Sequence, residues 1–237
     1  YAGNGTGAFG GDNGLATAAN LNRPQKISFD NAGNLFIADT NNNRIRRVAF
    51  DTKIITTVAG SGTNGFSGDD GPATLAALKS PSDVAVDTAG NLWIADTSNN
   101  RVRRVDVVTG KITTHTANLN APSAIAIAVK VIPPNTIEET LMIGNTNASK
   151  VLRVKLSGGC CTDVGNGSVG FSGEGVAAAA ASLRFPNAVA FDGIGNLYVV
   201  DTVNNRIRKI AAGTGMITTL AGGSSSGFFG DNGPATA

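Results

Sequence analysis

Aspartate and arginine recur together in this chain, each aspartate five positions before its arginine. The three copies are Asp39 with Arg44, Asp96 with Arg101, and Asp201 with Arg206. Clustered carboxylates could act as general acids and bases, or ring a channel. Each pair, however, flanks a short polar turn between apolar runs, where a charge-assisted hydrogen bond would hold a hairpin together. Because the repeated pairs cannot all share one active site, we predict structural hairpin pairs.

Acidic residues also recur inside glycine-rich loops. These loops are residues 11–14, 68–71, 173–175 and 230–233. Calcium binds several carboxylate and carbonyl oxygens, so the loops are candidates for that ion. They lack the EF-hand spacing, and tight turns require Gly, Asp and Asn for conformational reasons. We therefore predict no metal and no cofactor, with calcium at these loops as the alternative.

Histidine is too scarce for the common hydrolytic and metal sites. His115, the only histidine, lies in a run of threonines that predicts a plain strand position. Glu138 and Glu139 are the acidic pair that is not repeated elsewhere, and a hydrolase using carboxylates alone would need them. The sequence therefore favours a non-catalytic protein.

Two cysteines, Cys160 and Cys161, are adjacent. Disulfides normally join Cα atoms about 4.4–6.8 Å apart, whereas neighbours across a trans peptide lie about 3.8 Å apart, so a bond between them would be strained. We predict this vicinal disulfide, with two free thiols or a bridge to another chain as alternatives. A thiol enzyme is disfavoured because His115 lies in another part of the chain.

Composition narrows the class of protein. The chain has 237 residues, of which 15% are charged and 5% aromatic, and its net charge is +2. No apolar run reaches the roughly 18 residues of a membrane span. Eleven of the 19 basic residues lie in the segments after the repeated aspartates, where they could form a surface for an acidic glycan. The small net charge and few aromatics argue against nucleic acid as a partner.

Near copies of a sixteen-residue segment indicate the fold. They are residues 33–48, 90–105 and 195–210, and residues 141–154 form a degenerate copy in which Asn145 replaces the aspartate. Apolar residues alternate between polar clusters, which predicts four short strands per unit, at about 25–30, 34–39, 44–50 and 53–58 in the first. Such sheets, repeated about every 55 residues, are typical of β-propellers.

The sequence resembles the long-loop NHL-repeat propellers of bacterial secreted proteins and teneurin-like proteins. The matching residues of the second unit are 68–74, 81–87, 90–97 and 100–105, with close copies in units one and four. The resemblance implies an all-β β-propeller of four-stranded antiparallel blades, about four NHL-like blades plus the start of a fifth repeat. It implies little about function, since family members include enzymes, RNA-binding proteins and adhesion modules.

We predict a single propeller domain or segment over residues 1–237. Its repeat units are approximately 2–58, 59–116, 117–164 and 165–220, with a partial repeat at 221–237. Residues 2–18 and 221–237 correspond to each other, for which three explanations compete. The chain is a fragment of a longer propeller, or closes on itself, or completes neighbouring copies head to tail in rings or filaments.

The third unit departs from the repeat. Eight residues are inserted around 131–136, and the glycine-rich loop before the unit has lost sixteen. Loops tolerate such changes and often carry binding, although drift would look the same. The binding loop predicted here comprises Val131, Ile132, Asn135, Glu138 and Glu139.

These patterns predict a non-catalytic extracellular scaffold, secreted or on the cell surface, that binds a protein partner or further copies of itself. Low charge and Asn-x-Ser/Thr sequences at Asn4, Asn147 and Asn166 suit export and glycosylation. The alternative is an NHL-type hydrolase or lyase with its site on the irregular face of the third unit. The resemblance implies that such lyases build a metal site from several histidines, and His115 alone cannot reproduce one.

Overall fold

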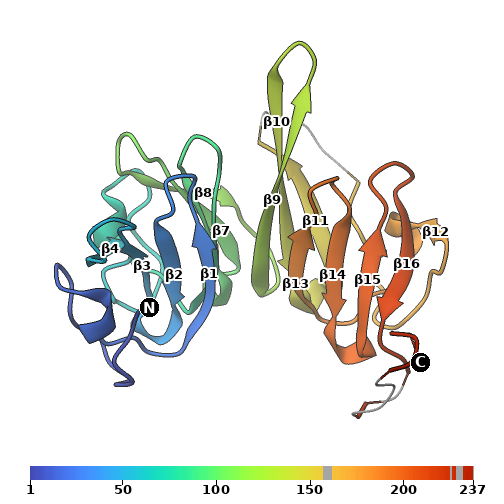
Figure 1. The fold of residues 1–237 in the computed structure, drawn as a ribbon, viewed down its shortest axis with the longest axis horizontal. Coiled ribbons are helices and arrows are strands. Elements are labelled where there is room, and N and C mark those ends of the chain that lie inside the picture. The colour runs from blue at the N-terminus through green and yellow to red at the C-terminus, as the bar shows by residue number, and fades with distance from the viewer. Residues whose placement is uncertain (157–161, 225, 228–231, 237) are drawn as a thin grey trace. The chain divides into compact units, whose positions relative to one another are not determined.

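The chain folds as a succession of antiparallel β-sheets joined by glycine-rich loops (Figure 1). The computed structural model describes residues 1–156, 162–224, 226–227 and 232–236. The chain divides into two compact units, Tyr1–Pro122 and Ser123–Ala237, which are described separately. An all-β fold is confirmed.

Unit 1 contains two four-stranded sheets, each with its strands in sequence order. Sheet 1 consists of β1 (Pro24–Phe29), β2 (Leu35–Asp39), β3 (Arg44–Val48) and β4 (Ile55–Ala59). Sheet 2 consists of β5 (Pro81–Val86), β6 (Leu92–Asp96), β7 (Arg101–Val105) and β8 (Ile112–Thr116). Both sheets have the four strands that the alternating apolar residues predict.

Unit 2 contains sheets 3 and 4, which differ from that pattern. Sheet 3 has three strands in the described part of the chain: β9 (Pro122–Ile132), β10 (Thr136–Asn145) and β11 (Lys150–Lys155). Sheet 4 has five: β12 (Val176–Ala177), β13 (Pro186–Phe191), β14 (Leu197–Asp201), β15 (Arg206–Ile210) and β16 (Met216–Ala221). The extra strand arises because the loop before sheet 4 pairs with β16.

A short 3-10 turn joins the second and third strands of every sheet. These turns are η2 (Thr40–Asn42), η4 (Thr97–Asn99), η5 (Thr146–Ala148) and η7 (Thr202–Asn204), whereas η1 (Ala16–Ala18), η3 (Ala73–Leu75) and η6 (Ala178–Ala180) lie in the loops before β1, β5 and β13. The residue after η2, Asn43, adopts φ 52°, and Asn100 and Asn205 do the same. Asparagine tolerates this left-handed conformation better than most residues, which explains the repeated Asn before each arginine.

Long loops cover the last strand of sheets 1, 2 and 4. In sheet 1, the N–H of Asn13 donates to the carbonyl of Ile55, and the N–H of Ile55 donates to the carbonyl of Gly14. Asp70 donates in the same way to Ile112, and Gly175 to Ile217. An edge strand with unpaired backbone groups would pair with other chains, so these loops protect the sheet edges.

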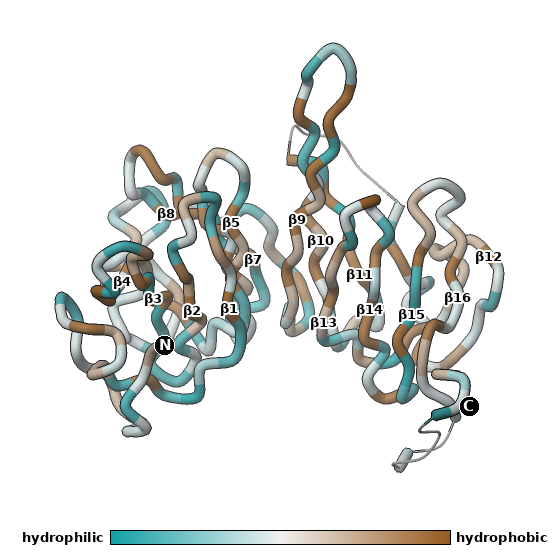
Figure 2. The backbone as a smooth tube through the Cα atoms, in the orientation of Figure 1, coloured by the Kyte–Doolittle hydropathy of each residue, from teal (hydrophilic) through white to brown (hydrophobic). Residues whose placement is uncertain are grey.

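The core lies between sheets and under the loops. Ala38 and Ile45 of sheet 1 pack in one buried cluster with Ile94 of sheet 2 and with the loop alanines Ala73 and Ala76. Hydrophobic stretches follow the strands in Figure 2, and hydrophilic ones lie at several of the turns. Small loop residues allow the loop backbone to lie close against the sheets.

The insertion in the third repeat extends a hairpin. β9 and β10 contain 11 and 10 residues, whereas β1 and β2 contain 6 and 5. Their distal ends project beyond the other strands of unit 2 (Figure 1). The added residues therefore form a structured arm, which we call the inserted hairpin (residues 128–140).

Gly60 tests how closely the loops approach the turns. Its φ is +91°, and a Cβ atom there would lie 2.2 Å from the carbonyl oxygen of Asn43. We expect Gly60→Ala to lower the free energy of unfolding by at least about 2 kcal/mol, measured by urea denaturation. Gly213→Ala is the control, because its Cβ would meet nothing within 4 Å, and it should change stability by less than about 0.5 kcal/mol. Equal effects would contradict the close approach.

Candidate functional site

A fully buried arginine occupies the middle of the third strand in sheets 1, 2 and 4. These residues are Arg46, Arg103 and Arg208, each with 0% of its surface exposed. In sheet 1, Nη1 of Arg46 lies 3.3 Å from Oδ2 of Asp39, at the end of β2. Nη2 lies 2.6 Å from Oδ1 of Asp12, in the glycine-rich loop. The guanidinium therefore joins a strand to a loop through two carboxylates.

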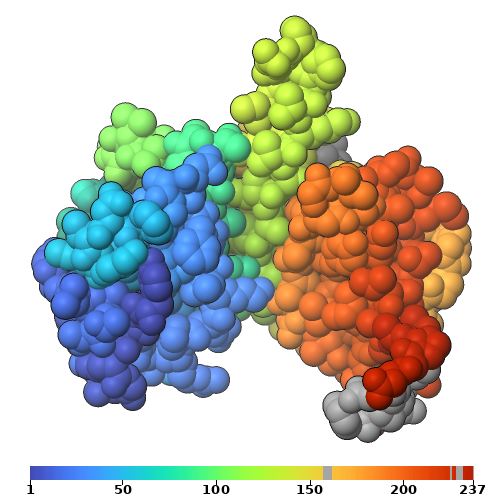
Figure 3. Space-filling model, viewed as in Figure 1, coloured from blue at the N-terminus to red at the C-terminus, as the bar shows by residue number. Residues whose placement is uncertain are grey.

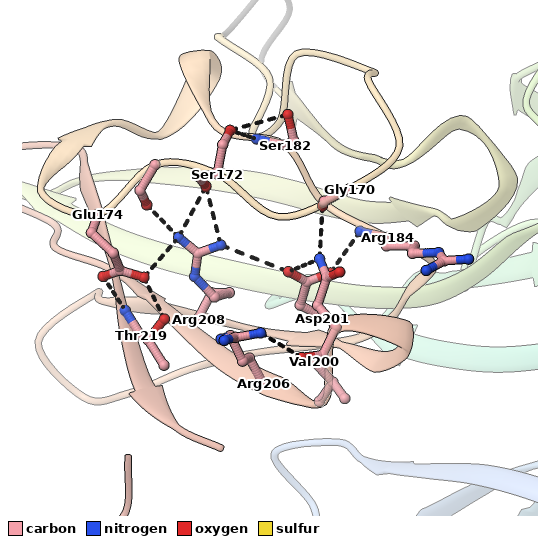
Figure 4. Close-up of polar contacts among 12 residues, drawn as sticks. Gly170, Ser172, Glu174, Ser182, Arg184, Val200, Asp201, Arg206, Arg208 and Thr219 are labelled. Atoms are coloured by element: carbon pink, nitrogen blue, oxygen red, sulfur yellow. Dashed lines mark hydrogen bonds and ion pairs between the residues drawn. The ribbon is translucent and has the colours of Figure 1, made fainter. Parts of the chain in front are cut away.

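The same arrangement recurs in the other two sheets. Nη2 of Arg103 lies 2.7 Å from Asp69, and Nη1 lies 3.6 Å from Asp96. In sheet 4, Glu174 replaces the loop aspartate. Figure 4 shows the guanidinium of Arg208 between the carboxylates of Glu174 and Asp201, at 3.4 and 3.7 Å. We call each set of one arginine and two acids a loop clamp.

The ion pairs of the three aspartates differ from the predicted hairpin pairs. Asp39 is directly opposite Arg44 in the strand register, as Asp96 is to Arg101 and Asp201 to Arg206. Each carboxylate nevertheless forms its ion pair with the arginine two residues further along. Side chains two apart share one face of a strand, so both arginines face the loop, and the second reaches the interior.

The first arginine of each strand instead lies at the rim. The guanidinium of Arg44 stacks 3.6 Å from the ring of Phe9 and donates to the carbonyl of Ser61 at 2.6 Å. Arg101 stacks on Phe66 at 3.5 Å, and Arg206 stacks on Phe171 at 3.9 Å. These arginines fix the loop aromatics by cation–π contacts.

The loop carboxylates, which were candidate calcium ligands, are directed at protein cations. One oxygen of Asp12 accepts from Arg46, and the other accepts from the hydroxyl of Thr57 at 2.7 Å. Asp69 is held in the same way by Arg103 and Thr114. Within the described ranges, no three His, Cys, Asp or Glu side chains are grouped so that they could hold a metal.

Burial affects the strand aspartates directly. Asp96 and Asp201 have no exposed surface, and burial raises the pKa of both carboxyls because the interior disfavours the charged form. Asn99 and Asn204 each donate a hydrogen bond to these carboxylates at 2.8 Å. The same two amides also donate to loop carbonyls, at 2.7 Å. The repeated polar side chains therefore hold the loops against the sheets through hydrogen bonds and ion pairs.

Sheet 3 lacks a loop clamp. Leu152 occupies the position of the buried arginine, Asn145 that of the strand aspartate, and Ala148 that of the bridging asparagine. The long loop before the sheet is also missing. The sequence pattern did not distinguish the buried arginines from the other basic residues of their strands. One sequence signal could have identified them. The third repeat lacks the long glycine-rich loop, and it also has Leu152 where the other repeats have the buried arginine.

A groove about 830 Å³ in volume lies in unit 2, beside the inserted hairpin. β9 and β10 form one wall, β11 contributes Arg153 and Lys155, and the β13–β14 turn forms the opposite wall. The hairpin stands out beside this region in Figure 3. We call this 830 Å³ groove the hairpin groove. Its lining residues are 127–131, 138, 140, 153, 155, 191–195 and 212.

Five charged side chains line the hairpin groove. Nζ of Lys155 lies 2.5 Å from Oε1 of Glu138, and this hydrogen-bonded ion pair lowers the pKa of Glu138. Asp192 accepts hydrogen bonds from the amide of Asn196 at 2.7 Å and from the hydroxyl of Tyr198 at 3.0 Å. Chiefly because of Asn196, the pKa of Asp192 falls to about 2. Both acids are therefore ionised and already have partners.

The predicted binding loop is distributed over the inserted hairpin. Val131 and Glu138 line the groove, Ile132 ends β9, and Asn135 lies between the strands. Glu139 follows Glu138 within β10, so the two side chains point to opposite faces of the strand. They do not form the carboxylate pair that a glycosidase-type mechanism requires.

The remaining candidates are His115 and the two cysteines. His115 lies in β8, as predicted, with its ring edge-on to Trp93 at 4.7 Å. Burial, together with Arg104, lowers its pKa. Cys160 and Cys161 lie outside the described residues, so the vicinal disulfide stays a prediction.

Comparison with known proteins identifies the repeat. The family model described as the teneurin NHL domain matches residues 13–106. Mouse Teneurin-1 is 31% identical over 85% of this chain, and human NHL repeat-containing protein 2 is 24% identical over 90%. These matches support an NHL-repeat propeller. The chain spans 8% of Teneurin-1 and 34% of NHL repeat-containing protein 2.

Solved structures agree with the fold of this NHL-repeat chain. A virginiamycin B lyase from Staphylococcus aureus superposes with a TM-score of 0.52 at 18% identity, covering 83% of this chain and 55% of the lyase chain. An auxiliary nutrient binding protein from Bacteroides thetaiotaomicron gives 0.60 at 16%, covering 90% and 51%. Identities this low support the fold alone. No helix in the described NHL repeats is long and apolar enough to cross a membrane.

The two arginines of one strand should differ in their effect on stability. Arg103→Met leaves Asp96 buried and without its cation, so we expect the free energy of unfolding to fall by about 3–5 kcal/mol. Arg101→Met removes a rim contact with Phe66 and should cost about 1 kcal/mol. Urea denaturation of both variants measures the difference. An equal loss would show that the clamp is not the stronger interaction.

Proposed function

We propose that this NHL-repeat protein is a non-catalytic extracellular interaction scaffold that binds a protein partner through the hairpin groove. The observation that carries the proposal is the inserted hairpin, the one segment added to the repeat, which forms a wall of the groove. The repeated polar residues support it indirectly, because their side chains are engaged in loop clamps. Binding segments on a rigid scaffold are a common arrangement in repeat proteins.

Exposed apolar side chains surround the groove. Val129, Val131 and Ile137 of the inserted hairpin are 50%, 64% and 54% exposed, and Ile194 of the facing turn is 81% exposed. A group of neighbouring exposed apolar side chains is typical of an interaction surface, whereas isolated ones need no explanation. The combination favours a macromolecular partner.

The alternative, a hydrolase or lyase on the same face, has weaker support. The pair with Lys155 makes Glu138 a poor general base, since a lowered pKa weakens its affinity for a proton. Glu139 points away from Glu138 along β10. The likeness to a lyase extends to the fold and is no argument about chemistry.

An extracellular location agrees with three glycosylation sequences whose asparagines are exposed. The side-chain amides of Asn4 and Asn166 donate to the carbonyls of Ala18 and Ala180, both at 3.1 Å. Asn147 is exposed in η5. Attachment of a glycan at Asn147 would leave both of those hydrogen bonds intact.

The proposal also includes self-association of the chain. The N–H of Gly3 donates to the carbonyl of Ala16 at 2.8 Å, and Gly222 donates to Ala235 at the same distance. The corresponding loops thus share a backbone interaction that two copies of the chain could exchange.

Light scattering across micromolar concentrations should show mass growing in steps of one chain, and a constant monomer mass would refute self-association.

A shortened hairpin tests the scaffold proposal. We expect replacement of residues 128–140 by the sheet 1 turn, residues 30–34, to change the free energy of unfolding by less than about 1 kcal/mol. Cross-linking mass spectrometry on the exported protein should locate partner contacts on the inserted hairpin, and these should disappear in the shortened variant. Val108→Ser, which removes an 89% exposed side chain of unit 1, is the control. Partner contacts that survive shortening would refute the proposal.

A further inference from the structure

A smaller cavity adjoins the hairpin groove within unit 2. Its volume is about 60 Å³, and we call it the inner cavity. All residues that line the groove and the inner cavity belong to unit 2. Four of them line both spaces: Arg153, Phe191, Gly195 and Ala212. The groove and the inner cavity are therefore adjacent parts of one binding region, between the face of sheet 3 and the turns of sheet 4.

The inner cavity is apolar except at one place. Nine of the ten described residues that line it are apolar or glycine, and the tenth is Arg153. Met142 and Leu197 belong to one buried cluster and are 1% and 4% exposed, so the cavity reaches the core of unit 2. Each water-sized group needs about 10–15 Å³, so about four to six such groups fit. An aliphatic side chain of the size of leucine fills this space.

Two differences from the other repeats reduce the side-chain volume around Arg153. Met142 holds the position in sheet 3 that Phe36 holds in sheet 1. Ala212 holds the position in sheet 4 that Val107 holds in sheet 2. Methionine is thinner and more adaptable than phenylalanine, and alanine is smaller than valine. The inner cavity therefore lies where unit 2 has departed from the repeat.

The charges of the groove favour an anionic ligand. Within the described ranges, neither Arg153 nor Lys130 forms an ion pair at 4 Å or less. Both charges lower the pKa of Glu138, although the hydrogen bond and ion pair with Lys155 lower it more. Arg153 and Lys130 therefore act on the same stretch of the groove, whose lining has three cations and two carboxylates. This excess of positive charge attracts an anion.

The position of Arg153 restricts the chemistry of that anion. Because Arg153 lines the inner cavity as well as the groove, an anion on its guanidinium lies beside an apolar space. A carboxylate matches a guanidinium through two parallel hydrogen bonds. In a polypeptide, only the C-terminal residue carries a carboxylate and an aliphatic side chain on the same carbon atom. The site therefore fits the end of a chain better than an acidic residue within one.

We infer that unit 2 binds the C-terminal end of its protein partner, with an aliphatic last residue in the inner cavity and the α-carboxylate on Arg153. The preceding residues of the partner lie in the hairpin groove. There, Val129 and Ile194 offer exposed apolar side chains, and Lys130 offers a second positive charge. Recognition of a C-terminal carboxylate is a recurring mode of peptide binding. The inference rests on the proposed function, of which it names the part of the partner that is bound.

Labelled peptides test the recognition of a chain end. The probe is fluorescein-Glu-Gly-Val-Gly-Leu with a free α-carboxylate, and fluorescence anisotropy measures its binding to the full chain. Amidation of the C-terminus should weaken binding at least about fivefold, because the charge-assisted contact with Arg153 is lost. Replacement of the last leucine by glycine should weaken binding at least about tenfold, because no side chain fills the inner cavity. Equal binding of either altered peptide would overturn the inference.

Two variants of the protein locate the bound peptide. Arg153→Gln should weaken binding of the free-carboxylate probe at least about fivefold and leave binding of the amidated peptide unchanged. Ala212→Val narrows the inner cavity and should weaken binding of the probe at least about threefold. Arg47→Gln and Val107→Ala are the matched controls, because they change the corresponding positions of unit 1. Thermal melts check that each variant folds, and unchanged affinity in folded Arg153→Gln or Ala212→Val would overturn the assignment.

Acetyl-leucine distinguishes the end of a protein from a free small acid. It has the same carboxylate and side chain as the last residue of the probe, but it lacks the residues that occupy the hairpin groove. We expect it to displace the probe at least about tenfold less effectively than the unlabelled peptide does. Equal displacement would show that the site takes a small carboxylic acid, and capture of a protein end would be wrong.

The outcomes separate this inference from the proposed function. If the probe fails to bind while partner cross-links still map to the inserted hairpin, the chain-end inference is wrong and the scaffold proposal stands. If the probe binds as expected while partner contacts survive shortening of the hairpin, the chain-end site is supported and the scaffold proposal fails.

Discussion

The structure depends on an arginine held without solvent between two carboxylates. Arg46 illustrates the constraint, because an isolated cation at 0% exposure would be strongly destabilising, and Asp39 and Asp12 together offset that cost. One acid comes from the neighbouring strand and the other from a loop with little regular structure. The loop is thereby required by the sheet, since its removal would leave a charge imbalance in the interior.

Sheet 3 shows what happens when this requirement is relieved. The loop is absent there, and the positions of the arginine, its strand acid and its bridging amide carry Leu152, Asn145 and Ala148. A buried arginine that keeps only part of its partners is costly, so the set is retained or replaced together. Sheet 3 is therefore the place where the repeat has changed its polar interior and extended a hairpin.

Much of the fold was predictable because short stretches of sequence determine the strands and turns. Alternating residues and the Asn before each arginine specify the strands and turns of sheets 1 and 2 within a few positions. The ion-pair partner of Asp39 was not predictable. The strand register alone favours Arg44, and identifying Arg46 requires knowing that the loop covers that face of the sheet. Likewise, counting residues places the insertion in the third repeat, but the wall around Ile194 comes from a distant turn that no local pattern connects to it.

The spacing within each loop clamp has a consequence for folding during synthesis. The loop acid precedes its arginine by 34 residues in sheets 1 and 2, and the same interval separates Glu174 from Arg208. A chain emerging from the ribosome therefore presents every loop before the cation that fixes it. Each loop therefore has no cation to hold it until the third strand of its own sheet has been made.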